Sequence, residues 1–118
     1  MTTEPGIYTF TVYQGATFNP LITWKDQTNT PVNLTGYTAR MMMRTAVNAP
    51  LPFVTLTTEN GGITLGGMAG TIALLITATT TTSITPTAGF YDLELIDGSG
   101  NVTRLLQGNV IISQEVTR

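Results

Sequence analysis

Two acidic residues, Asp92 and Glu94, come nearest to a catalytic pair in this sequence. They lie in a segment that alternates between apolar and polar residues, which is typical of a β-strand, so both carboxylates would share one face. Two such carboxylates can divide general acid and general base roles. Two acids on an exposed strand face are more often solvated, however, and the chain has no histidine to act as a base. We therefore expect no catalytic residue and no enzyme activity.

Residues 97–101 (DGSGN) place oxygen-bearing side chains at alternate positions, as the first half of a calcium-binding loop does. Val102 replaces the glycine expected at the sixth position, and Gly108 stands where the twelfth position requires a glutamate. The chain also has no cysteine, which removes thiolate metal sites and disulfides. We expect a plain hairpin turn here, and no metal or cofactor anywhere in the chain.

Three consecutive methionines, Met41, Met42 and Met43, are flanked by Arg40 and Arg44. Strand alternation would place Met41 and Met43 in the core and turn Arg40, Met42 and Arg44 to the opposite face. Met and Arg are enriched at protein interfaces. The outward trio is therefore our candidate interface; the alternative is a strand that merely carries one exposed methionine.

The elements that would position these residues centre on a long β-hairpin over Gly89–Val116. Tyr91, Leu93 and Leu95 would form its buried face, and residues 97–101 its turn. A glycine within a strand often marks a bulge or bend, so we expect one at Gly108. A hairpin of this kind is not stable alone, and the rest of the chain must cover its apolar face.

Further strands are expected over Ile7–Tyr13, Thr17–Lys25, Tyr37–Thr45, Phe53–Thr57, Ile63–Leu65 and Thr71–Ala78. Pro20 predicts that the second of these strands lies at an edge or is bulged. Residues 79–86 favour a one-turn helix or an irregular crossover, and residues 1–6 a loose end. This spacing predicts an all-β fold, an immunoglobulin-like, Greek-key β-sandwich of seven to eight antiparallel strands forming a single domain over 1–118. A closed barrel is the alternative.

Composition narrows the classes of partner. Only 10% of the 118 residues are charged, the net charge is −2, and five basic residues are too few for a nucleic-acid footprint. The chain has no polybasic run, no signal peptide and no apolar run long enough to span a bilayer, so we expect no membrane partner. So little charge suggests that part of the surface is covered in an assembly, and a symmetric homo-oligomer is expected. A monomer kept soluble by Thr and Asn is the alternative.

Several segments carry a family resemblance, namely Gln14–Thr17 (QGAT), Ile22–Asp26 (ITWKD), Pro31–Arg40 (PVNLTGYTAR), Asn60–Ile63 (NGGI), Gly70–Ile72 (GTI), Gly89–Leu95 (GFYDLEL) and Gly108–Val110 (GNV). Over residues 13–118 the chain resembles small β-sandwich virion proteins of tailed bacteriophages, and is similar to the amino-terminal domain of siphophage baseplate upper proteins. It departs from their pattern at Ala16 and Asn33, where an aspartate is expected.

The resemblance implies a structural virion protein, made in the host cytoplasm, that docks fibres or receptor-binding proteins onto a tail or baseplate through protein–protein contacts. Its partners would be other virion proteins of the tail, baseplate or capsid. The alternative is a capsid decoration protein or a receptor- or glycan-binding module. A glycan platform would need an exposed aromatic side chain, whereas alternation places Trp24 inward together with Phe18 and Ile22.

Overall fold

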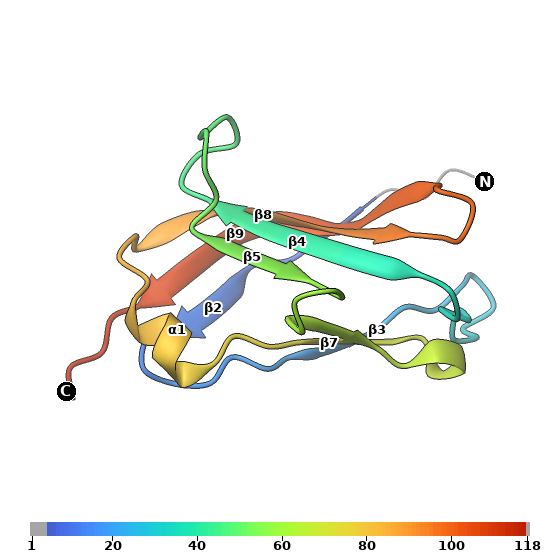
Figure 1. Cartoon of the computed structure of the whole chain (residues 1–118), viewed down its shortest axis with the longest axis horizontal. Helices are drawn as coiled ribbons and strands as arrows, with labels where there is room; N and C mark the ends of the chain where they lie inside the picture. Colours follow the sequence, from blue (N-terminus) through green and yellow to red (C-terminus); the bar gives the residue numbers. More distant parts are fainter. Residues whose placement is uncertain (1–4, 118) are drawn as a thin grey trace.

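The computed structural model describes residues 5–117, which fold into two facing β-sheets with a short helix at one end (Figure 1). The strands are β1 (Gly6–Ile7), β2 (Phe10–Tyr13), β3 (Leu21–Thr23), β4 (Thr38–Arg44), β5 (Val54–Thr57), β6 (Ile63–Leu65), β7 (Thr71–Leu74), β8 (Ala88–Ile96) and β9 (Val102–Ser113). A 3₁₀ turn, η1 (Gly67–Ala69), precedes β7, and a helix, α1 (Ala78–Thr82), follows it. The expected all-β sandwich is confirmed.

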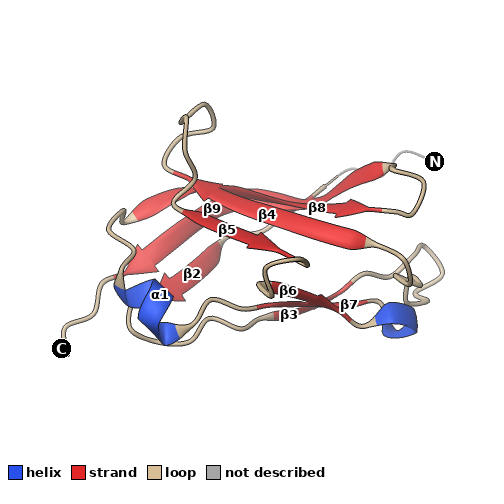
Figure 2. Cartoon of the chain, viewed as in Figure 1, coloured by secondary structure: helices blue, strands red, loops and turns tan. Residues whose placement is uncertain are grey.

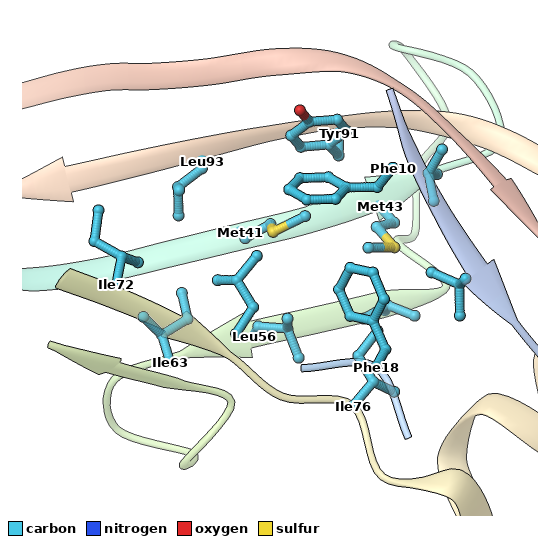
Figure 3. Close-up of a cluster of buried hydrophobic side chains, with 14 of the residues drawn as sticks. Phe10, Phe18, Met41, Met43, Leu56, Ile63, Ile72, Ile76, Tyr91 and Leu93 are labelled. Carbon is cyan, nitrogen blue, oxygen red and sulfur yellow. The ribbon is translucent and has the colours of Figure 1, made fainter. Parts of the chain in front are cut away.

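The two sheets differ in size (Figure 2). The large sheet has the order β1-β9-β8-β4-β5, with β2 also paired to β9, and the small sheet has the order β3-β7-β6. Tyr91, Leu93 and Leu95 point from β8 into the space between the sheets and are buried, as predicted. Met41 and Met43 are buried beside them, and Figure 3 shows both sulfur atoms within this cluster. Period-two alternation therefore sets the inner face of both strands.

The amino-terminal segment differs from the expected strand. It forms two short strands because pairing is interrupted at Tyr8 and Thr9, and this brings the number of strands within residues 5–117 to nine. Both pieces run parallel to β9, whereas every strand was expected to be antiparallel. The loose end expected over residues 1–6 lies mostly outside the described residues, but Gly6 already pairs with Leu106.

The irregularity in β9 lies beside Gly108 rather than at it. Leu93 pairs with Leu106 and Glu94 with Arg104, so Leu105 is the extra residue of the bulge. Gly108 is regularly paired, and a Cβ atom there would stand 2.3 Å from the carbonyl oxygen of Tyr8. The glycine is thus required for close approach of the amino-terminal segment.

The second expected strand is shorter than predicted. Only Leu21–Thr23 is β-strand, and Phe18 reaches the small sheet through an isolated bridge to Ile76. Pro20 has no N–H to donate, although its carbonyl accepts from Leu74 N at 3.0 Å. β3 lies at the edge of the small sheet, as Pro20 predicted.

The expected one-turn helix is present as α1. The Thr77 side chain caps its first turn by accepting from Thr80 N. Thr81 is fully buried, accepts from Gly15 N at 3.1 Å and donates to the Ala16 carbonyl at 2.9 Å. These bonds fasten the crossover to the turn that follows β2.

Candidate functional site

The outer face of the large sheet brings the candidate residues together. We define it as the side chains of β4, β8 and β9 that point away from the core, which form three cross-strand rows: Arg40–Glu94–Arg104, Met42–Asp92–Gln107 and Arg44–Phe90–Asn109. In β4 and β8 these residues alternate with buried ones, and in β9 the residues between them are only partly buried. The predicted interface trio therefore lies on one face, as expected, and the acidic pair lies on the same face beside it.

The carboxylates of Asp92 and Glu94 are neutralised by arginines from neighbouring strands. Arg40 Nε lies 2.7 Å from Glu94 Oε1. Arg104 Nε lies 3.6 Å from Asp92 Oδ2 and 4.0 Å from Glu94 Oε2. The pair thus forms part of a surface ion-pair network. Cross-strand partners this distant in sequence could not be assigned from local pattern.

Arg44 is bound differently from the other two arginines of the outer face. Its Nη1 donates to the Ala49 carbonyl at 2.9 Å, and its Nη2 donates to the Met42 sulfur at 3.3 Å. Within residues 5–117, no carboxylate forms an ion pair with it. Because a guanidinium carries five N–H donors, Arg44 can still bind an acceptor from another molecule.

A hollow of about 500 Å³ opens on the outer face beside Arg44. Its apolar lining comes from Ile7, Met42, Val47 and Phe90, which belong to four different segments. The exposed fractions of Ile7, Val47 and Phe90 are 82%, 80% and 41%. The local sequence pattern does not single out these three residues as site residues, although alternation does place Ile7 on the opposite face from Phe10. Their grouping depends on the pairing of β1 with β9 and on the loop after β4.

The sequence that resembles half a calcium loop forms a self-contained turn. Asp97 Oδ1 accepts from Ser99 N and Asn101 N, both at 2.9 Å, and Oδ2 accepts from Asn101 Nδ2 at 3.1 Å. The Asn101 side chain, followed by the Asn101 backbone N–H, lowers the pKa of Asp97. Asp97 therefore stabilises the hairpin turn. No group of three His, Cys, Asp or Glu side chains that could hold a metal occurs in the described part of the chain.

Trp24 is half-buried rather than presented as a platform. Its ring meets the ring of Tyr37 edge-on, with centroids 6.2 Å apart and an interplanar angle of 86°. Both residues, like Ile22, pack against the core. Phe18 is buried, so the predicted inward direction of this segment holds.

Comparison with known proteins bears on the fold. No protein-family model and no curated protein sequence matches the chain. A solved structure of the extracellular domain of the voltage-gated sodium channel beta4 subunit superimposes with a TM-score of 0.52 over 98% of each chain, at 10% identity. The fold is immunoglobulin-like. The large sheet and the small sheet of this chain form the two layers of the sandwich.

At this identity the similarity establishes the architecture and not the activity. The extracellular domains of the beta4 subunit form parallel homodimers, which explain the role of that subunit in cell–cell adhesion. Immunoglobulin domains of antibodies link their sheets by a disulfide, whereas this chain has no cysteine and relies on packing. No helix among residues 5–117 is both long and apolar enough to cross a membrane.

Proposed function

We propose that the protein is a structural virion component of a tailed bacteriophage, an adaptor that docks fibres or receptor-binding proteins onto the tail or baseplate. The virion assignment rests on the sequence resemblance. The proposal that the protein docks through its outer face rests on one observation. Apolar side chains line the hollow there, beside an arginine that has no carboxylate partner in the described chain.

The chemistry of this hollow defines the partner that it fits. Exposed Ile7, Val47 and Phe90 offer apolar surface, and burying such surface is the main driving force of protein association. Arg44 offers a planar fork of donors that suits a carboxylate. The partner surface would therefore present an apolar side chain next to an aspartate, a glutamate or a chain terminus.

A symmetric homo-oligomer within the particle is part of this proposal. The low charge of the chain reduces electrostatic repulsion between copies. The parallel homodimers of the beta4 extracellular domain are a precedent for self-association in a domain of this fold. Closed symmetry is the usual arrangement of soluble homo-oligomers.

Incorporation into the phage particle tests the contact. Met42→Asp and Arg44→Gln should fold as the unchanged protein does and be depleted from purified particles, because each alters the hollow without touching the core. Thr64→Asp is the matched control, since Thr64 is exposed on the small sheet. If the two hollow variants are incorporated as well as Thr64→Asp, the outer face is not the contact.

Labelling the protein in intact particles tests its location. We expect label at the tail or baseplate. Label over the head would favour the alternative, a capsid decoration protein, and absence from the particle would overturn the virion proposal. Quenching of Trp24 fluorescence by an added glycan would favour the glycan-binding alternative. The half-buried position of the Trp24 indole does not favour that alternative.

A further inference from the structure

At the outer edge of β5, a side-chain amide makes the hydrogen bonds that a neighbouring strand would otherwise make. β5 is the last strand of the large sheet, and Figure 2 shows it at the margin beside β4. Its sequence, Val-Thr-Leu-Thr, has no proline and no charged residue, the features that usually protect an edge. β1 and β3, by contrast, are preceded by Pro5 and Pro20. A segment as rich in β-formers as β5 is a template for pairing with another chain.

The register shows which backbone groups of β5 face outward. Thr58 N donates to the Ala39 carbonyl on β4, so this pair is hydrogen-bonded across the two strands. Alternate residues of an antiparallel strand bond to opposite sides, and the backbone groups of Leu56 therefore face β4. The N–H and C=O groups of Thr55 and Thr57 then point away from the sheet.

The side-chain amide of Asn60 takes two of these outward groups. Its Oδ1 accepts from Thr57 N at 2.9 Å, and its Nδ2 donates to the Thr55 carbonyl at 3.0 Å. A residue in a parallel neighbouring strand would make the same two bonds, one on each side of Leu56. Oδ1 also accepts from Gly62 N at 2.8 Å, and Asn60 N donates to Thr57 Oγ1 at 2.9 Å, which hold the amide in place.

We infer that Asn60 closes the β5 edge against strand pairing, and that a second copy of this chain is the partner it excludes. A second copy presents the same edge, so two β5 strands can pair about a two-fold axis and join two large sheets into one. With this edge closed, the protein would contact its partners through the faces of its sheets and not through the edge of β5. This inference does not depend on the proposed function, because β5 edge pairing does not use the hollow on the outer face.

Sedimentation of Asn60→Ala over a range of protein concentrations tests the inference. Removing the amide frees Thr55 O and Thr57 N, and we expect the variant to form dimers or larger species at concentrations where the unchanged protein does not gain mass. The double variant Asn60→Ala/Thr55→Pro should lose this association, because the Thr55 N–H faces the incoming strand and makes no bond to β4. The added association should persist in a Met42→Asp background, which separates it from contact through the outer face.

Hydrogen exchange supplies a measurement on the unchanged protein. In the monomer the Thr57 amide should be protected, because Asn60 accepts its hydrogen, while the Thr55 amide at the same edge should exchange rapidly. In Asn60→Ala the Thr57 amide should exchange rapidly under conditions where the variant is monomeric. A folded Asn60→Ala that sediments as the unchanged protein does, or a Thr57 amide that exchanges as fast as that of Thr55, would overturn the inference.

Discussion

The hydroxyl of Tyr91 donates a 2.7 Å hydrogen bond to the backbone carbonyl of Tyr8, 83 positions away in the sequence. The bond joins β8 to the break between β1 and β2, across β9. Gly108 on β9 leaves room for the Tyr8 carbonyl, and the ring of Tyr91 packs 5.0 Å from the ring of Phe10. One side chain thus fastens the amino-terminal segment to the centre of the large sheet.

Replacing Tyr91 tests how much its hydrogen bond to Tyr8 contributes to stability. Tyr91→Phe keeps the ring but leaves the Tyr8 carbonyl without its donor, so we expect the free energy of unfolding to fall by about 1 kcal/mol, the usual value of one hydrogen bond. Urea denaturation measures the change. Tyr13→Phe is the control, because Tyr13 is exposed on β2, and it should leave the free energy of unfolding unchanged.

Ionisation of the Tyr91 hydroxyl should lower the stability of the folded protein at alkaline pH. Burial, together with the nearby Tyr8, raises the pKa of Tyr91 from 10.0 to about 12. The folded state therefore favours the protonated phenol, and its contribution is complete below pH 10 and is lost as pH rises through 12. We expect denaturation midpoints of the unchanged protein to fall across this range more steeply than those of Tyr91→Phe. Equal slopes for the two proteins would contradict the shift.

The two faces of β8 should respond differently to mutation. Leu93 is fully buried, and its truncation to alanine should cost about 2–5 kcal/mol, through lost burial and the cavity left behind. Asp92→Asn removes an exposed ion pair of 3.6 Å, which is worth no more than about 1 kcal/mol. Thermal unfolding of both variants checks this, and similar losses of stability would mean that the assigned register is wrong.

Substitutions of the three methionines of β4 test the predicted alternation of its side chains directly. Met41→Asp or Met43→Asp would bury an unpaired carboxylate, which costs several kcal/mol, and either variant should yield little folded protein. Met42→Asp should fold almost normally, because this side chain lies on the outer face near Arg44. Circular dichroism of the three purified variants distinguishes these outcomes. An unfolded Met42→Asp protein would contradict the placement of this strand.

The Asp97 turn should weaken at acidic pH. Its hydrogen bonds with Asn101 and Ser99 lower the pKa of Asp97 below its ordinary value of 3.8. The ionised carboxylate stabilises the folded turn above that value, and the contribution disappears as pH falls through the lowered pKa. Asp97→Ala should therefore destabilise the protein at neutral pH and lose that effect in acid. A stability difference that stays constant down to the lowest pH would show that the carboxylate charge is not involved.

Strands whose two faces differ in polarity can be predicted from the amino-acid pattern alone. Alternation identified the inner face of β4 and of β8, including Met41, Met43 and Leu93, because successive side chains in a strand point to opposite sides. Pro20 predicted an edge strand, and residues 97–101 predicted a turn, for equally local reasons. These features depend on residues close together in the chain, so a single sequence reveals them.

Which strands are neighbours could not be predicted in this way, since pairing joins segments far apart in the chain. The parallel contact of β1 and β2 with β9 is one such case, and it explains both Gly108 and the exposed position of Ile7. The ion pairs of Arg40 and Arg104 with the acidic residues of β8 also depend on strand order. So does the hollow beside Arg44, because its walls meet only after the sheet has assembled and local periodicity carries no information about such contacts.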